Sequence, residues 1–123
     1  MCLRTIHKKK RDWRVGYKSF VIEGKQLKTR FKKMPMKIGK TYIDEEGFKI
    51  TAIEGRKYEK GFHFFRSLEA AKTHAQYSDF DVVVVMVKTK NLTATGTQRF
   101  MSVGKAEVGV AKEITLLKIV YPE

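Results

Sequence analysis

The chain has 123 residues, of which 42% are hydrophobic and 11% aromatic, and its 26 Lys and Arg against 13 Asp and Glu give a formal net charge of +13. This size and apolar content predict one folded domain with a single core and exclude a disordered chain. The longest apolar run, at residues 82–87, is too short for a membrane helix, and a single cysteine excludes a disulfide framework. The basic N-terminus lacks the apolar segment of a secretory signal. We therefore expect an intracellular, cytoplasmic protein with no membrane partner.

The positive charge is concentrated in the first third of the chain. Residues 1–40 hold 14 Lys and Arg against two carboxylates, a balance of +12, whereas the remaining residues hold 12 basic and 11 acidic groups, a balance of +1. Such asymmetry favours an anionic partner: nucleic acid, a nucleotide, an acidic protein surface or anionic lipid. The alternative is a basic surface that only keeps the protein soluble.

The first half of the chain is predicted to be mostly extended. Residues 1–12 read as a basic arm, too charged to pack, ahead of a single domain at 13–123. Alternating apolar residues predict a strand at 13–22, a tight turn at 23–25 and a returning strand at 26–31.

The next segment is less regular. Residues 28–40 contain a proline and a glycine typical of a loop or sheet edge, although a second helix there is an open alternative. Residues 41–55 predict two short extended pieces around an acidic turn at 44–47.

The stretch GFHFFRSLEAAKTHA at 61–75 predicts a strand followed by a helix. Ser67 is a natural N-cap, Glu69 lies in the first turn where the helix dipole favours an anion, and alanines at helical spacing give a small, flat face. The helix is expected at about 67–77.

The last third predicts further strands. Residues 82–87 are apolar on both faces, as in a central strand covered on both sides. Residues 91–105 read as a polar connection with glycines, and 106–110 and 113–120 as two more strands. The fold class is α+β: one domain with a mostly antiparallel sheet of about seven strands and one helix.

His63 is the first candidate for a functional side chain. If Phe62 and Phe64 face the core, His63 and Phe65 face the other way, because side chains alternate along a strand. His63 is then either a buried, hydrogen-bonded structural residue or a ligand contact in a groove. Two isolated imidazoles are poor grounds for a metal site, so we expect none.

The basic third supplies the candidate anion-binding residues. WRVGYKSF mixes cationic and aromatic side chains in the way that proteins use to stack bases and hold phosphates. The alternative is that Trp13, Tyr17 and Phe20 are simply core. With Arg66, which lies beside the helix N-terminus, the candidates are Arg14, Tyr17, Lys18, Lys28, Arg30, Lys32, Lys33, His63 and Arg66.

GFHFFRSLEAAKTHAQY, DVVVVMV and AEVGVAKEITLLKIV, in this order, resemble the strand–helix–strand motifs of ADP-ribosyltransferase-like domains. GFHFF after an upstream VGYKSF also resembles a set of small bacteriophage proteins. The resemblance covers about two-thirds of the chain and implies an ADP-ribosyltransferase-like fold.

The resemblance also implies an activity whose catalytic parts match incompletely. Such enzymes hold NAD with a His or Arg where this chain has Lys18, and His63 stands where they usually present Ser, Thr or Tyr. Glu107 matches the catalytic glutamate, with Glu113 as the fallback. NAD would be the cofactor of an active enzyme; otherwise we expect no cofactor.

The leading expectation is a phage-type basic binding protein without catalysis. Its partner would be nucleic acid, an anionic nucleotide or a host nucleic-acid-handling complex, in the host cytoplasm, and its action could be inhibition of host defence. The alternatives are a mono-ADP-ribosyltransferase that modifies a host protein or nucleic acid, and a protein-only inhibitor that docks a basic face on an acidic surface.

Overall fold

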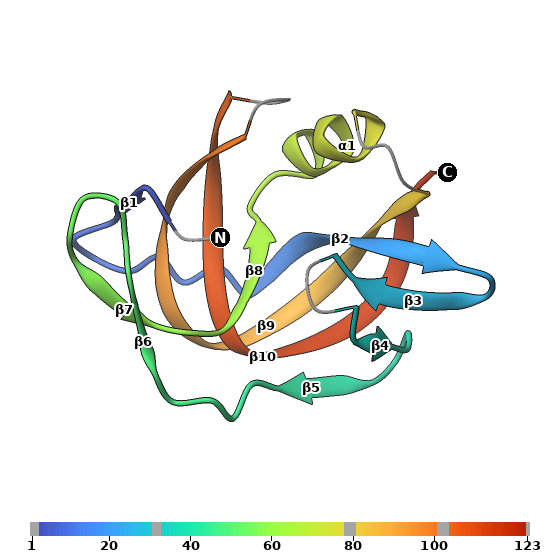
Figure 1. The fold of residues 1–123 in the computed structure, drawn as a ribbon, viewed down its shortest axis with the longest axis horizontal. Coiled ribbons are helices and arrows are strands. Elements are labelled where there is room, and N and C mark those ends of the chain that lie inside the picture. The colour runs from blue at the N-terminus through green and yellow to red at the C-terminus, as the bar shows by residue number, and fades with distance from the viewer. Residues whose placement is uncertain (1–2, 31–32, 78–80, 101–103, 123) are drawn as a thin grey trace.

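A computed structural model describes residues 3–30, 33–77, 81–100 and 104–122. These residues form a mostly antiparallel sheet with one helix packed against it (Figure 1). In chain order the elements are β1 (Thr5–Ile6), β2 (Val15–Glu23), β3 (Gln26–Thr29), β4 (Pro35–Met36), β5 (Thr41–Ile43), β6 (Lys49–Thr51), β7 (Lys57–Glu59), β8 (Phe62–Phe65), α1 (Leu68–Gln76), β9 (Val82–Phe100) and β10 (Gly104–Tyr121).

Two long, curved strands, β9 and β10, form the centre of the sheet (Figure 1). The main sheet has the order β1-β9-β10-β8-β2-β3-β4, while β5 pairs with β10, and β6 and β7 form a separate two-stranded sheet. β2 also pairs with β9 along Val15–Val21 and touches β8 at Tyr17. The strands β2, β9, β10 and β8 therefore close a ring.

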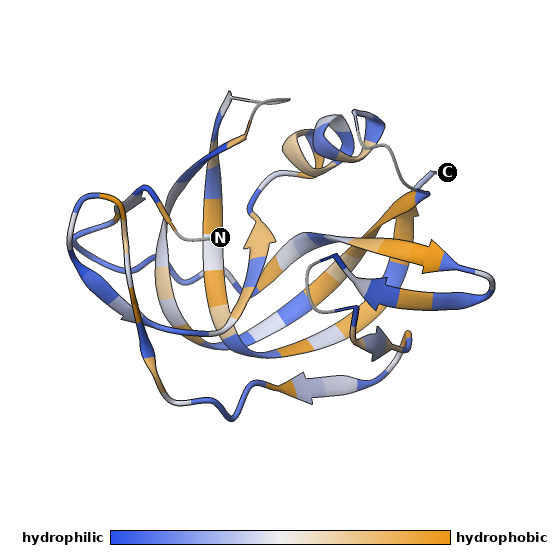
Figure 2. Cartoon of the chain, viewed as in Figure 1, coloured by the Kyte–Doolittle hydropathy of each residue, from blue (hydrophilic) through white to orange (hydrophobic). Residues whose placement is uncertain are grey.

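The core lies on both faces of these strands. Val84, Phe65 and Val108 belong to one buried cluster, with Leu3 and the alanines of α1. Val83 and Val85 belong to the other, with Phe20, Phe64, Ile114 and Leu116. Figure 2 shows apolar residues along the strands that cross the middle of the molecule. Coverage on both sides confirms the prediction of a central strand at 82–87.

The helix begins and ends close to the predicted positions. Ser67 is its N-cap, and its hydroxyl accepts a hydrogen bond from the Ala70 N–H at 3.3 Å. Ala71 and Ala75 are buried, so the small face lies against the sheet, where α1 contacts β9, β2 and β8. In the described residues no helix is long and apolar enough to span a membrane.

Several other local predictions are confirmed. The hairpin between β2 and β3 turns at Gly24, whose φ of +65° suits glycine. The two extended pieces around the acidic turn are β5 and β6, although they pair with different partners, β10 and β7.

The N-terminal segment packs against the sheet, contrary to our expectation of a basic arm separate from the domain. Leu3 is fully buried and Thr5–Ile6 pair with β9. The segment also donates from His7 N to the Thr95 carbonyl at 2.8 Å. Its charged side chains point outward while its backbone pairs, which a count of charges does not reveal.

The prediction of a polar connection at 91–105 is wrong for residues 91–100, which continue β9. Thr95, Thr97 and Gln98 are buried there. Thr97 Oγ1 lies 2.6 Å from Thr5 Oγ1, and Thr95 Oγ1 lies 2.8 Å from His7 Nδ1, so partners from the N-terminal segment satisfy the buried hydroxyls. Residues 101–103 lie outside the described part of the chain.

Two further predictions of secondary structure differ from the structure. The strands expected at 106–110 and 113–120 are one strand, β10, whose pairing with β9 shifts register between Val110 and Ala111. An irregularity of this kind bends a strand without ending it. The second helix considered at 28–40 is absent from the described residues of that segment, which instead contain the end of β3 and the short β4.

Candidate functional site

Two hollows on the described part of the chain combine charged side chains from distant segments. The first, the cationic groove, lies where residues 10–14 run beside β9 and has a volume of about 870 Å³. Its lining consists of Lys10, Arg11, Asp12, Trp13, Arg14, Glu59, Lys88, Thr89, Lys90, Asn91, Leu92, Thr93 and Lys112. Six of these side chains are Lys or Arg and two are carboxylates.

Backbone pairing positions the two sides of the cationic groove. The Arg14 carbonyl accepts from Thr89 N at 2.8 Å, and Arg11 N donates to Thr95 Oγ1 at 3.0 Å. Asn91 has a left-handed φ of +57° and lies close to the register shift at which Val110 pairs with Ala94 but Ala111 pairs with Leu92. Lys90, Asn91 and Leu92 all line the groove at this irregular part of β9.

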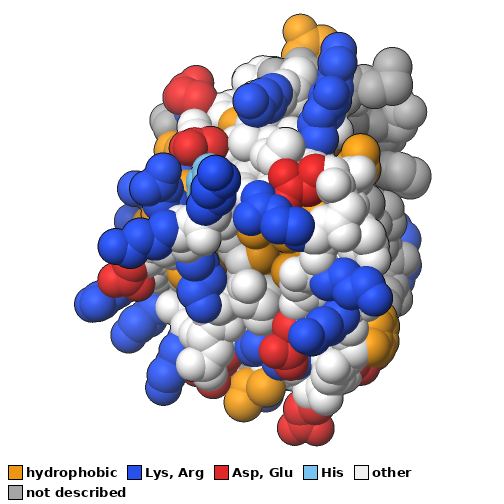
Figure 3. Space-filling model, turned by 90° about the vertical axis from the view of Figure 1, so that its left-hand side faces the viewer, with side chains coloured by type: hydrophobic (Ala, Val, Ile, Leu, Met, Phe, Trp, Pro, Cys, Tyr) orange, Lys and Arg blue, Asp and Glu red, His pale blue; other side chains and the backbone are white. Residues whose placement is uncertain are grey.

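Both carboxylates of the groove are in ion pairs. Arg14 Nη2 lies 3.1 Å from Asp12 Oδ2, and both side chains are exposed. Lys112 Nζ lies 3.2 Å from Glu59 Oε1. The remaining cations, Lys10, Arg11, Lys88 and Lys90, have no ion pair with a carboxylate among the described residues. Figure 3 shows many Lys and Arg side chains on the side of the molecule that carries β1, β6 and β7.

Trp13 is half-buried at the groove and already has neighbours on its ring. The ring of His7 meets it edge-on with centroids 5.7 Å apart, and the Arg66 guanidinium lies 5.6 Å from its centroid. Trp13 also packs against the second core cluster. These contacts support the interpretation of Trp13 as a structural residue at the edge of the core.

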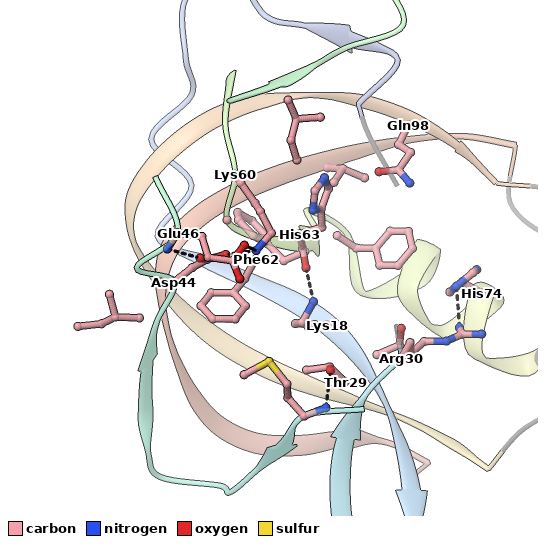
Figure 4. A pocket seen from close by; sticks show the side chains of 18 of the residues that line it. Lys18, Thr29, Arg30, Asp44, Glu46, Lys60, Phe62, His63, His74 and Gln98 are labelled. Carbon is pink, nitrogen blue, oxygen red and sulfur yellow. Dashed lines mark hydrogen bonds and ion pairs between the residues drawn. The ribbon is translucent and has the colours of Figure 1, made fainter. Parts of the chain in front are cut away.

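The second hollow, the inner cavity, has a volume of about 490 Å³ and lies between β2, β8 and the β5–β6 connection. Its charged and polar lining includes Lys18, Thr29, Arg30, Asp44, Glu45, Glu46, Lys60, His63, His74 and Gln98 (Figure 4). Phe62, Phe64, Phe65, Phe100, Ile50 and Val108 supply apolar wall. Such a mixture of apolar walls and a few polar groups is typical of small-molecule sites.

Lys18 and His63 lie next to each other in this cavity. Lys18 Nζ donates to the His63 carbonyl at 2.9 Å, and burial lowers the pKa of Lys18 to about 8. Burial, together with the positive charge of Lys18, lowers the pKa of His63 to about 3. His63 is therefore neutral at physiological pH, and Lys18 is mostly protonated but close to titration.

The two ends of the inner cavity carry opposite charge (Figure 4). At one end Arg30 Nη1 lies 2.7 Å from His74 Nε2, and burial and the Arg30 charge lower the pKa of His74. At the other end Lys60 Nζ contacts Asp44 at 2.8 Å and Glu46 at 3.1 Å. Burial opposes ionisation of Asp44, but hydrogen bonds from Lys60 and the Glu46 backbone lower its pKa overall.

The fold brings together only some of the residues singled out from sequence. Lys18, Arg30 and His63 line the inner cavity, and Arg14 lines the cationic groove. Tyr17 packs against the first core cluster, whereas Arg66 lies over Trp13.

The other sequence candidates lie outside both hollows. Lys28 and Lys33 contact Glu23 at 2.9 and 3.8 Å on the β2–β3 side, away from either lining. Glu107 is exposed on β10 and lines neither hollow, nor does Glu113. Lys32 lies outside the described residues.

Among the six groove cations, the sequence-based search named only Arg14 as a candidate. It placed Lys10 and Arg11 in the basic arm without proposing them as binding residues, and it missed Lys88, Lys90 and Lys112 altogether. They lie in the part of the chain whose charge is nearly balanced, and only the pairing of β9 with β10 and the N-terminal segment assembles them with Lys10 and Arg11. The alternation of Lys88 and Lys90 with buried Thr89 was the available signal. In the described residues no cluster of three or more metal-ligating side chains occurs.

Comparison with known proteins gives no assignment. No family model matches the chain, and neither curated proteins nor solved structures match it. The site itself therefore carries the functional inference.

Proposed function

We propose that the protein binds nucleic acid through the cationic groove and carries out no catalysis there. The observation that carries the proposal is the convergence of Lys10, Arg11, Lys88 and Lys90, from two distant segments, without carboxylate partners among the described residues. Lysines and arginines held along one groove attract a sugar–phosphate backbone and release its counterions.

Binding through this groove is expected to depend little on base sequence. The cations reach phosphates, which carry no sequence information directly, and the Trp13 ring is occupied by Arg66 and His7. The asymmetric charge of the chain, +12 in residues 1–40, adds long-range attraction to the same partner. Resemblance to phage proteins extends the proposal to host targets such as guide or transfer RNA, and to inhibition of host defence.

Fluorescence anisotropy with a labelled 20-nucleotide RNA or DNA tests the proposal. Four cations without carboxylate partners among the described residues predict that log affinity falls against log salt with a slope of about −3 for a single strand. The variant Lys88→Ser/Lys90→Ser should halve this slope, whereas Lys118→Ser, which removes an exposed lysine of β10 outside both hollows, should leave it unchanged. Absence of binding at low salt, or an equal slope in the groove variant, would contradict the proposal.

The protein-only alternative predicts a different result in cells. A basic face docked on an acidic protein would keep its host partner after nuclease treatment, whereas a complex held through nucleic acid would dissociate. Co-purification with and without nuclease separates the two.

An ADP-ribosyltransferase-like fold with transferase activity is the other candidate, and its support is the sequence resemblance. The position of Glu107 outside both hollows does not add to that support. Transfer of label from NAD to host lysate that is abolished by Glu107→Gln would establish the activity in place of simple binding.

A further inference from the structure

The inner cavity contains a half-buried cation, Lys18, that has no carboxylate partner among the described residues. Lys18 extends from β2 into the cavity, where its ammonium donates to the His63 carbonyl and has no carboxylate within ion-pair distance among the described residues (Figure 4). An ammonium has three donors, so two remain for a ligand. Taking a charge out of water is unfavourable unless a partner compensates it, and a buried cation in a cleft is a candidate for a functional site.

A second cation is held at the wall of the same cavity. The contact of Arg30 with His74 Nε2 fixes the guanidinium, and His74 is in turn fixed by the rings of Phe65 and Phe100, with centroids 5.5 and 4.9 Å away. Arg30 keeps its charge at neutral pH, and its planar guanidinium can bind two oxygens of a phosphate at once. The cavity therefore offers a rigid cation beside aromatic walls.

The other end of the cavity favours hydrogen-bond donors on the ligand. Lys60 forms ion pairs with both Asp44 and Glu46, which leaves one negative charge among the three groups, and Glu45 adds an exposed carboxylate at the lining. Carboxylates at this position accept hydrogen bonds from sugar hydroxyls, as in many nucleotide sites. The lining contains three Lys or Arg and three carboxylates, so its formal net charge is zero. We therefore expect the ligand to be selected by where the positive and negative groups lie in the cavity.

We propose that the inner cavity binds a nucleoside monophosphate, with its phosphate at Lys18 and Arg30, its base against the aromatic walls and its sugar toward Glu45. The volume of about 490 Å³ lies within the range of roughly 300–1,000 Å³ for small-molecule sites. This site is separate from the cationic groove, because the two linings share no residue. The proposal of a nucleoside monophosphate site therefore does not depend on nucleic-acid binding by the groove.

Isothermal titration calorimetry with AMP, GMP, CMP and UMP in turn tests the proposal on the full chain. At least one of them should bind with a Kd below about 100 μM, a free energy near −5.5 kcal/mol. The matching nucleoside and inorganic phosphate should each bind at least tenfold more weakly, because each lacks half of the recognised groups. A cavity with cations at one end and carboxylates at the other could instead bind an aromatic amino acid, whose carboxylate and ammonium carry opposite charges. L-Phenylalanine is titrated to test this alternative.

Three variants complete the test. Lys18→Met and Arg30→Gln should each weaken the monophosphate at least tenfold, while Lys118→Ser keeps wild-type affinity. Lys18→Met removes a desolvated charge and is expected to fold, so its loss of binding cannot come from unfolding. Binding of none of the four monophosphates, binding of L-phenylalanine instead, or undiminished affinity in both cavity variants would overturn the proposal. Lys88→Ser/Lys90→Ser acts on the groove alone, so failure of the two proposals can be told apart.

Discussion

The hydroxyl of Tyr58 lies 3.4 Å from Nε2 of His63 and accepts a hydrogen bond from the Leu3 N–H at 3.0 Å. Because the backbone of Gly61 also hydrogen-bonds to the His63 ring, the neutral tautomer that carries its proton on Nδ1 satisfies both ring nitrogens. One hydroxyl thus connects the N-terminal segment, β7 and the wall of the inner cavity.

We expect Tyr58→Phe to destabilise the protein by about 1–3 kcal/mol, since the buried Leu3 N–H and His63 Nε2 both lose their partner. Urea denaturation at neutral pH measures this change. Tyr77→Phe is a suitable control, because the side chain of Tyr77 is 73% exposed, and it should change stability by less than about 0.5 kcal/mol. Equal stability of the two variants would mean that the hydroxyl is not a structural link.

The low pKa of His63 predicts a loss of stability in acid. The unfolded chain takes up this proton below about pH 6.5, whereas the folded chain does so only near pH 3, so stability is complete above 6.5 and falls as the pH is lowered. The slope from this group is at most about 1.4 kcal/mol per pH unit.

Replacing His63 by Gln should reduce the acid slope of stability, measured as urea midpoints between about pH 4 and 7. Lys18 and Lys60 add positive charge near the ring, and the Tyr58 hydroxyl lies 3.4 Å from Nε2. His74 also has a lowered pKa, so His63→Gln/His74→Gln should flatten the curve further. An unchanged slope in both variants would show that neither imidazole is protected from protonation.

The lowered pKa of Lys18 predicts how the stability of the protein changes with pH in the alkaline range. Its folded pKa of about 8 lies below the ordinary 10.5, so the unfolded chain holds more protons between these values and stability rises with pH there. Lys18→Met should stabilise the protein at pH 7 by roughly 1–3 kcal/mol, because the penalty of the buried charge disappears.

The same variant should lose most of its advantage by pH 10.5, where wild-type Lys18 is neutral in the folded protein and only half protonated in the unfolded chain. Thermal denaturation at pH 7, 9 and 10.5 follows this convergence, with Lys118→Met as the exposed control. A Lys18→Met protein that is less stable than wild type at pH 7 would show that Lys18 makes a net favourable contact.

The ring of Phe64 lies between two glycines, Gly16 on β2 and Gly109 on β10. A Cβ at Gly16 would lie 2.1 Å from a ring carbon of Phe64, and a Cβ at Gly109 would lie 2.3 Å from another. Either glycine to alanine should cost about 1–3 kcal/mol through overpacking.

Phe64→Leu should recover part of that cost when it is combined with Gly16→Ala, since it removes the atoms in conflict. Gly47→Ala is the matched control, because no heavy atom lies within 4 Å of its Cβ. Additive losses in the double variant would contradict direct contact between the ring and β2.

Local patterns in the sequence predicted the elements whose stability is local. Alternation at 62–65, the Ser67 cap and the apolar run at 82–87 each depend on neighbours in the chain. The threonines of β9 could not be recognised in this way, because their hydroxyls are satisfied by Thr5, His7 and Arg11, about 84–92 residues away.

The residues of the candidate sites also fall into two groups, those that the sequence indicated and those that only the fold brings together. Lys18 and Arg30 were found because they lie in the basic third, but their place in the lining of one cavity follows from the pairing of β2 with β3 and β8. The alternation of Lys88 and Lys90 with buried Thr89 marks an exposed strand face, but it does not show that these lysines meet Lys10 and Arg11. A charge count locates a basic segment, and only the sheet register decides which cations share a surface.

The last prediction concerns how the N-terminal segment is held beside β9. A Cβ at Gly96 would lie 1.9 Å from the Thr5 carbonyl oxygen, so Gly96→Ala should displace β1 and expose Leu3, which is fully buried. Loss of a buried leucine costs about 2–5 kcal/mol, which sets the upper range of the expected destabilisation. Hydrogen exchange should show faster exchange at Arg4 N and His7 N, which pair with Thr97 and Thr95.

Because that displacement also moves Lys10 and Arg11 away from Lys88 and Lys90, Gly96→Ala should lower nucleic-acid affinity without removing any charge. Its salt slope should fall toward that of Lys88→Ser/Lys90→Ser, whereas Gly47→Ala should bind like wild type. If Gly96→Ala releases the segment by hydrogen exchange and binds with the wild-type slope, the phosphates are held by separate cations and not by the assembled groove.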